Sequence, residues 1–277
     1  MSQLIYLRQR IKAIETIKKI THAMRLISMS AHTRMRQQDD ALKAYIKASS
    51  NLLKRVKYAL PTWKNPLIEP SQKPQSRPLL ILIGSQKGLC GNFNSSLLNF
   101  FFNNYKNLNA IDIIVVGKKM IDLVTDKNIK ISSQYSDLHV TTLTTIAQEI
   151  VKFILAKEPS SVSLVSNQLK SFFVQKPHIT HLIPVEEQIA DLKPTEDYHW
   201  EQSPQEVLDN LLQQIIESQI QYILFQSLYA EQAARFLSMD NSTRNAQSLL
   251  DQTKLQYNKL RQAKITKELT ELTGSNF

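Results

Sequence analysis

Apolar side chains recur at intervals of three and four along the first sixty residues. The series that keeps this spacing is Leu4, Leu7, Ile11, Ile14, Ile17, Ile20, Met24, Ile27, Ala31 and Met35. A narrow apolar stripe of this period on an otherwise polar segment predicts a long amphipathic helix. Neither proline nor glycine occurs in residues 1–60, so we expect this helix to be continuous.

A second helical pattern occupies residues 205–277, which hold no proline and only one glycine, Gly274. Its apolar positions start broad and then narrow: Leu208, Leu211, Ile215, residues 220–228, Ala230, Ala234, Leu237, Leu249, Thr253, Tyr257 and Leu260. Stripes this narrow suit a two-stranded coiled coil. Connectivity then predicts antiparallel packing, because the first helix enters the middle of the chain at its C-terminal end and the last leaves it at its N-terminal end. The longer C-terminal helix is expected to extend past its partner.

The middle of the chain alternates between strand and helix patterns. Continuous apolar runs predict buried strands at 78–84 and 111–117, and weaker strand patterns occur at 160–168 and 178–185. Helical stretches lie at 94–108, 118–126 and 143–158, with Asn94 or Ser95 and Thr144 as candidate caps. This alternation predicts a Rossmann-like α/β domain with a mostly parallel sheet covered on both faces.

Proline positions suggest where the segments join. Five of the ten prolines fall at Pro61, Pro66, Pro70, Pro74 and Pro78, which is typical of an extended linker. We therefore expect an N-terminal coiled-coil helix (1–60), a proline-rich linker (61–78), an α/β globular domain (79–204) and a C-terminal coiled-coil helix (205–277). The fold class is α/β, with an antiparallel coiled coil formed by both termini.

The charge is concentrated in one segment. The net charge is +10, and residues 1–60 hold 13 Lys or Arg against three acidic residues. This excess suggests a polyanion or an acidic protein surface as partner, and a solvated helix face is the alternative. No run approaches the roughly 18 apolar residues of a membrane-spanning helix. The first 30 residues are interpreted as mature structure, with a mitochondrial-type presequence as the competing interpretation.

The stretch "GSQKGLCGN" (84–92) holds three of the five glycines and the only cysteine. A phosphate-binding loop or a nucleophile would fit its place after an apolar run. It lacks the Lys-Ser/Thr of a P-loop, however, and nothing in the sequence places a histidine beside Cys90 to activate its thiol. We expect a structural turn, in which Gly88 and Gly91 supply permissive backbone around Cys90.

Four segments carry a resemblance to a known family. They are "RQRIKAIETIKKITHAMRLIS" near the N-terminus, "GSQKGLCGNFN", "EDYHWEQSPQEVLDNLL", and a C-terminal helix that closes with "RQAKITKELTEL". In this order they resemble the gamma subunit of F-type ATP synthase. Departures include Gln86 and Lys87 in place of an acidic-arginine pair, and "SAHTRMR" where S-K-M-R-K is usual.

The resemblance implies a rotating central stalk without catalytic activity, metal or cofactor. Such a subunit couples ion flow through the membrane ring to ATP synthesis or hydrolysis at the beta-subunit sites. The implied partners are the alpha and beta subunits, the epsilon subunit and the c-ring. The implied location is peripheral, on the cytoplasmic face of the bacterial inner membrane.

The resemblance also assigns contacts to particular residues. The implied beta-subunit catch consists of Arg261, Gln262, Thr266 and Glu268; the shaft contact is Met24; and the membrane-ring contacts are Tyr198 and Glu201. From sequence alone, the alternatives are a solvated helix end for the first group, coiled-coil core for Met24, and a surface turn for the last pair.

Two other functions would fit parts of this sequence. A basic coiled coil could bind nucleic acid, but residues 1–60 contain only Tyr6, Tyr45 and Tyr58 as aromatic residues, which gives no interleaving suited to base stacking. We therefore expect no nucleic-acid partner. A small cysteine or phosphate-transfer enzyme would depend on Cys90, and we expect no catalytic residue.

Overall fold

The computed structural model describes residues 2–60, 63–65, 67–68, 76–184, 200 and 203–274. Its contacts divide the chain into two compact units. We call residues 1–30 with 235–277 the two-helix unit, and residues 31–234 the sheet unit. This division cuts both long helices, so the four-segment domain scheme stays a prediction.

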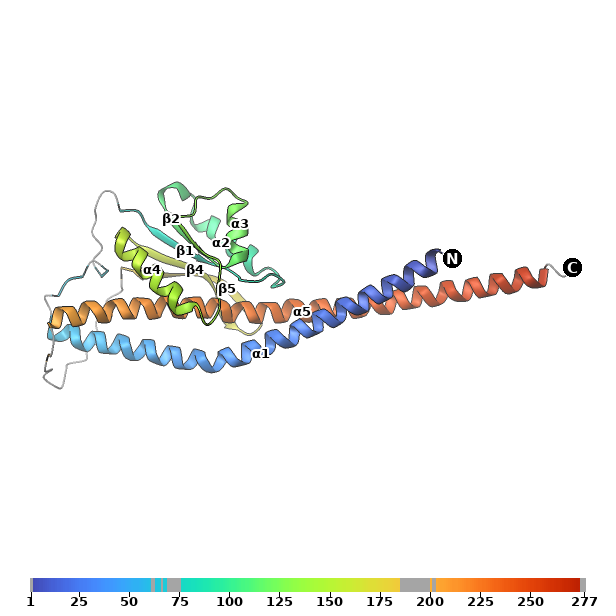
Figure 1. Cartoon of the computed structure of the whole chain (residues 1–277), viewed down its shortest axis with the longest axis horizontal. Helices are drawn as coiled ribbons and strands as arrows, with labels where there is room; N and C mark the ends of the chain where they lie inside the picture. The colour runs from blue at the N-terminus through green and yellow to red at the C-terminus, as the bar shows by residue number, and fades with distance from the viewer. Residues whose placement is uncertain are drawn as a thin grey trace. The chain divides into compact units, whose positions relative to one another are not determined.

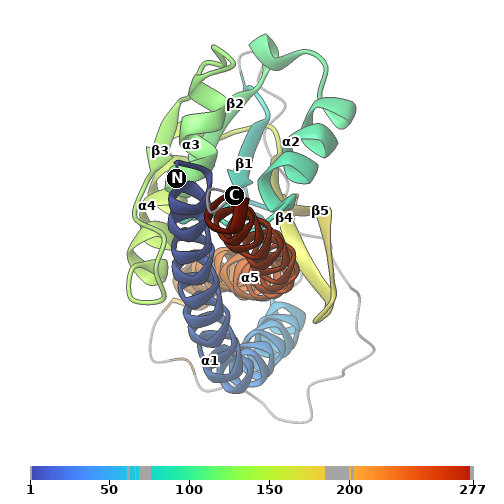
Figure 2. The same ribbon diagram turned by 90° about the vertical axis from the view of Figure 1, so that its right-hand side faces the viewer.

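The helices and most of the strands are labelled in Figure 1, and β3 is labelled in Figure 2. The helices are α1 (Ser2–Ala59), α2 (Phe93–Asn104), α3 (Lys118–Thr125), α4 (Leu143–Lys157) and α5 (Pro204–Gly274), with a short 3-10 turn, η1 (Leu108–Ala110). The strands are β1 (Leu79–Ile83), β2 (Asp112–Val116), β3 (Ser133–Tyr135), β4 (Val162–Ser171) and β5 (Val174–Ile183).

Two long uninterrupted helices confirm the prediction from spacing and from the absence of helix-breaking residues. The second helix begins at Pro204, whose fixed φ and missing N–H suit the first helical position. Glu206 lies in its first turn, where a carboxylate interacts favourably with the helix dipole. Among the described residues, no helix is both long and apolar enough to cross a membrane.

The sheet has the strand order β3-β2-β1-β4-β5. β1 pairs in parallel with β2 and with β4, and β2 pairs in parallel with β3. All four strands expected from the sequence are present. The sequence did not reveal the short strand β3, nor that β5 returns antiparallel to β4 as a hairpin.

Helices cover the sheet on both faces, as predicted. In β1, Leu79, Ile81 and Ile83 belong to a core cluster that includes side chains of α4 and α5. Leu80 and Leu82 point into a second cluster with α2 and α3. Successive strand side chains point to opposite faces, so a strand buried on both faces reads as a continuous apolar run.

Two expected caps are wrong. α2 begins at Phe93, before both Asn94 and Ser95. The Asn94 amide instead binds the end of β1, where its Oδ1 accepts from the Ser85 N–H at 3.0 Å. α4 begins at Leu143, and Thr142 flanks it in place of Thr144. The Thr142 Oγ1 accepts from the His139 N–H at 3.0 Å.

Glycine is required where β2 ends. Gly117 has φ of 100°, and a Cβ there would lie 2.6 Å from the Gly84 carbonyl oxygen. A side chain at this position would therefore meet both an unfavourable backbone conformation and a backbone clash.

Candidate functional site on the paired helices

The two-helix unit is held by contacts that cross between α1 and α5. Figures 1 and 2 show the two helices side by side, and both termini lie at the same end of the unit. The polar pairs are Glu15–Lys254 (3.0 Å), Lys18–Gln247, Thr21–Thr243 (2.9 Å) and Arg25–Asp240 (2.6 Å). Residue numbers rise along α1 while they fall along α5, so the helices run antiparallel, as predicted.

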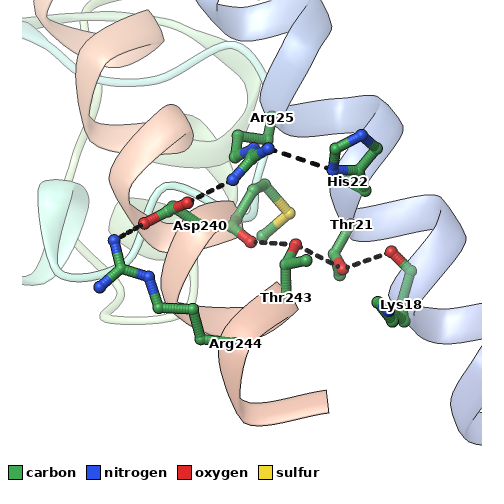
Figure 3. Close-up of polar contacts among 8 residues, drawn as sticks. Lys18, Thr21, His22, Arg25, Asp240, Thr243 and Arg244 are labelled. Atoms are coloured by element: carbon green, nitrogen blue, oxygen red, sulfur yellow. Dashed lines mark hydrogen bonds and ion pairs between the residues drawn. The ribbon is translucent and has the colours of Figure 1, made fainter. Parts of the chain in front are cut away.

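Asp240 is the acceptor for an arginine from each helix (Figure 3). The Arg25 Nη1 on α1 donates to Oδ1 at 2.6 Å, and the Arg244 Nη2 on α5 donates to Oδ2. The hydrogen bond from Arg25 is the largest cause that lowers the pKa of the Asp240 carboxyl, and the bond and charge of Arg244 add to it. Arg25 also donates from Nη2 to the His22 Nδ1 at 3.2 Å, which links its guanidinium to the preceding turn of α1.

A pair of threonines joins the helices one turn further along (Figure 3). The Thr21 and Thr243 hydroxyls lie 2.9 Å apart. Each also lies close to a carbonyl of its own helix, that of Lys18 at 3.1 Å and that of Met239 at 2.7 Å. Each hydroxyl has one proton to donate, so two of these three contacts can be hydrogen bonds at the same time.

Apolar packing continues the seam toward the termini. Ile14, Ala246 and Leu250 form a buried cluster, with Ile11 packed against it. Leu7 and Thr253 are also buried. The seam therefore alternates between apolar contacts and hydrogen-bonded polar pairs.

Part of the apolar stripe expected on α1 does not face α5. Ile17, Ile20 and Ile27 are 55%, 54% and 67% exposed. Thr21, Arg25 and Ser28 keep the same helical spacing one face away, and the first two contact α5 while Ser28 is buried. The two-helix unit thus presents an outward apolar face on α1, which we call the outer face and define by Ile17, Ile20 and Ile27.

The residues of the expected beta-subunit catch lie on α5 toward its C-terminal end. Arg261, Gln262, Thr266 and Glu268 are all exposed. Glu268 pairs with Lys264 at 3.3 Å, and the Thr266 carbonyl accepts from the Thr270 hydroxyl at 2.9 Å. α5 extends beyond the start of α1 in Figure 1, as expected for the longer helix.

The remaining expected contact residues are Met24, Tyr198 and Glu201. Met24 is partly buried on α1, between the seam and the outer face. Tyr198 and Glu201 lie outside the residues that the structure describes.

The Cys90 loop is packed as a structural turn. The Cys90 side chain is buried with Phe93 and Ala230. Gly91 has φ of 59°, where glycine is favoured. The expectation for Gly88 is wrong, because its φ is not positive and a Cβ there would meet nothing within 4 Å. Leu89 is instead the non-glycine residue of this turn with positive φ, at 64°.

A buried carboxylate that sequence reasoning missed anchors this loop. Glu231 on α5 accepts from the Gln86 N–H at 2.9 Å and from the Lys87 N–H at 3.3 Å. Just after this loop, at the start of α2, the Phe93 carbonyl accepts from the Asn167 Nδ2 of β4 at 2.8 Å. These hydrogen bonds fix the loop against α5 and the start of α2 against the sheet.

The cross-helix polar residues were also missed. A signal was present, since Thr21, Arg25, Ser28 and His32 share a helical spacing with the buried Ile14 and Met35. A stripe that is defined by apolar residues alone does not include these polar positions.

Two cavities of about 270 and 250 Å³ open in the sheet unit. Arg77, Asp112 and Lys157 are the charged residues of the first, and Glu158 and Asp209 those of the second. Among the described residues that line these cavities there is no cysteine or histidine. Within the described ranges, no group of three His, Cys, Asp or Glu side chains could hold a metal ion.

Comparison with known proteins covers nearly the whole chain. Residues 3–276 match the sequence profile of the family described as ATP synthase. An ATP synthase gamma chain of Clostridium perfringens is 32% identical over 98% of this chain and 96% of its own length. One of Pelotomaculum thermopropionicum is 33% identical over 99% and 98%.

Solved structures agree in fold. A chain from the OSCP/F1/c-ring structure of the Euglena gracilis mitochondrial ATP synthase matches with a TM-score of 0.72 at 17% identity, covering 99% of this chain and 93% of that one. A chain from the central stalk/c-ring structure of the Tetrahymena thermophila mitochondrial enzyme has a TM-score of 0.60 at 19% identity, covering 80% and 98%.

Proposed function

Because the chain belongs to the family of ATP synthase gamma chains, which are rotor subunits without a catalytic centre of their own, we propose that its two-helix unit is the part that turns inside a ring of alpha and beta subunits. Ion flow through the membrane ring would turn it, and the beta-subunit sites would make or hydrolyse ATP in response.

The seam between α1 and α5 is the observation that supports this proposal best. Four polar pairs and an apolar cluster hold the helices together, so a twist applied to one helix is transmitted to the other. The two helices expose different apolar side chains, Ile17, Ile20 and Ile27 on α1 against Leu249, Leu255 and Leu260 on α5, which makes the unit asymmetric about its axis. A partner shifts the equilibrium of a site only through contacts that differ between the states of that site. An asymmetric shaft supplies such differences to each beta subunit in turn.

The particular contacts belong to the same proposal. Arg261, Gln262, Thr266 and Glu268 would contact the beta subunits, with the Arg261 guanidinium donating paired hydrogen bonds to a carboxylate. Met24 would meet the ring beside the outer face. Tyr198 and Glu201 would contact the c-ring, and an epsilon subunit would join the complex. The location would be peripheral, on the cytoplasmic face of the bacterial inner membrane.

Co-expression with alpha and beta subunits tests the proposal. We expect this chain to co-purify with them as one complex and to support ATP hydrolysis that the same preparation lacks without it. A matched preparation with residues 235–277 deleted should lose the activity. If alpha and beta subunits hydrolyse ATP equally well with and without the full chain, the proposed coupling role is wrong.

A further inference from the structure

His32 lies in an aromatic cluster of the sheet unit that joins three elements. Its ring is 7% exposed and stacks on Tyr229 of α5, with centroids 4.3 Å apart and planes 23° apart. Phe172, in the turn between β4 and β5, packs its edge against the same ring, at 4.8 Å and 88°. His32 on α1 therefore contacts the tip of the β4–β5 hairpin through Phe172.

The buried imidazole has an unsatisfied nitrogen. Among the described residues, nothing forms a hydrogen bond with the His32 Nε2. Burial of a polar atom without a partner is unfavourable, and burial of a charged one is far more so. A protonated ring would have to bury an additional N–H without an acceptor.

The surrounding charges also oppose protonation. Arg36, one turn along α1, is the charged group that acts on His32, and it carries the same sign as an imidazolium. On α5, Tyr229 lies against the ring, and the charged groups near its phenol are Asp39, Arg36, Lys43 and Asp40. Asp39 accepts bonds from Lys43 and Gln226, so its charge is already compensated. Phe172, the hairpin residue on the ring, is uncharged.

The aromatic neighbours do not replace the missing acceptor. A stacked tyrosine offers an imidazolium a cation–π contact, but it leaves the Nε2–H without a hydrogen bond. Burial is the largest cause that lowers the pKa of His32, and the charge of Arg36 is the second.

We propose that His32 is a proton-sensitive contact that holds the hairpin tip on the paired helices of the sheet unit when its ring is neutral, and releases it when the ring takes up a proton from solvent. The tip carries Phe173, which is 71% exposed. Release would add Phe172 to this exposed apolar surface. The inference concerns the sheet unit alone and does not depend on the rotor assignment.

The sign of the effect follows from linkage. In the closed state the hairpin tip packs on His32, and the ring binds a proton more weakly than in the open state. In the open state the tip is released and His32 has its ordinary pKa of about 6.5. Acidification below this value therefore favours the open state, until the lowered pKa of the closed state is reached. Between the two pKa values the opening constant rises by up to about tenfold per pH unit.

Hydrogen exchange on the full chain tests this. We expect protection of the amides around the turn, residues 169–176, to fall severalfold from pH 7.5 to 5.5 after correction for intrinsic exchange rates. Amides of β1 serve as the internal reference for global unfolding. His32→Met, which keeps an apolar side chain but takes up no proton, should make hairpin protection independent of pH over this range.

His178→Gln is the matched control, because it removes an exposed histidine from the same hairpin and should retain the wild-type response. Should His32→Met perturb folding, an NMR titration of the wild-type chain decides: the His32 ring should titrate below its ordinary pKa, together with the Phe172 ring signals. Phe172→Leu, which removes the edge contact, should move that midpoint back toward the ordinary value. Titration of His32 at or above the ordinary value, or equal pH dependence in wild type and His32→Met, would overturn the proposal.

Discussion

Asp240 shows how one polar residue can set the alignment of two helices. Its carboxylate binds Arg25 across the seam and Arg244 on its own helix. A shift of α5 along α1 by one turn would separate Arg25 from Asp240 and Thr21 from Thr243. Apolar side chains tolerate such shifts better, because their contacts are not directional. Polar pairs in a coiled coil are known to select one register at some cost in stability.

Replacement of Asp240 by asparagine should weaken the seam through loss of the ion pair. We expect the free energy of unfolding at pH 7 to fall by about 0.5–1 kcal/mol, the range of partly exposed pairs. The pKa of Asp240 is lowered in the folded chain, so its contribution is present above the ordinary value near 3.8 and is lost as the pH falls through the folded value. The difference between wild type and Asp240→Asn should therefore shrink toward pH 2, in urea unfolding followed by circular dichroism.

Asp251→Asn is the control for this measurement. Asp251 lies on the same helix, and its hydrogen bonds, at 2.9 Å, come from Gln247 of that helix. Its replacement should have the smaller effect at pH 7. Equal effects of the two substitutions would argue against a cross-helix role for Asp240.

At the scale of the element, α1 carries two stripes with the same period. One contains Thr21 and Arg25 and packs on α5, and the other contains Ile17, Ile20 and Ile27 and faces outward. On α5, two neighbouring leucines likewise differ in whether they pack in the seam or face outward. Leu250 is 4% exposed in the seam, and Leu249 is 40% exposed.

The two leucines give a matched pair of substitutions. Leu250→Ala should lower the free energy of unfolding by about 2–4 kcal/mol, because it removes buried methyl groups from the cluster with Ile14 and Ala246. Leu249→Ala should cost less than about 1 kcal/mol, because surface substitutions have small effects. Denaturant unfolding of both variants measures the difference. The reverse order would show that α5 packs with the other face.

At the scale of the whole molecule, the exposed C-terminal part of α5 has little to do with folding of the chain itself. Arg261, Gln262 and Thr266 are exposed, and they follow the cross-helix pair Glu15–Lys254 along α5. Exposed side chains on a helix end contribute little to stability, so an effect of their substitution should become visible only with a partner.

The substitution Arg261→Gln distinguishes a role in folding of the chain from a role in contact with a partner. We expect the free energy of unfolding of the isolated chain to change by less than about 0.5 kcal/mol. ATP hydrolysis by its complex with alpha and beta subunits should fall severalfold, because the amide replaces a bidentate charged donor. Lys267→Gln is the control, since Lys267 is exposed nearby and pairs with Glu271 of its own helix at 3.6 Å. If both substitutions reduce hydrolysis equally, the assignment of Arg261 to a specific contact fails.

The two long helices, their antiparallel direction and the buried strands could all be predicted from the amino-acid sequence. These features follow from local spacing, from the absence of proline and glycine in residues 1–60, and from connectivity. The β4–β5 hairpin and the short β3 were not determined, because pairing between strands is decided by distant segments. The role of Asn94 also depended on a neighbour in space, because its amide binds Ser85.

Which face of α1 meets α5 depends on tertiary packing and could not be predicted from spacing. The apolar spacing of Ile17, Ile20 and Ile27 and the mixed spacing of Thr21, Arg25 and Ser28 are equally helical. The partner helix made the choice, because Asp240 and Thr243 offer hydrogen bonds that only the second set can satisfy. Burial of polar groups is favourable only when their partners are present, and those partners lie more than two hundred residues away in the chain.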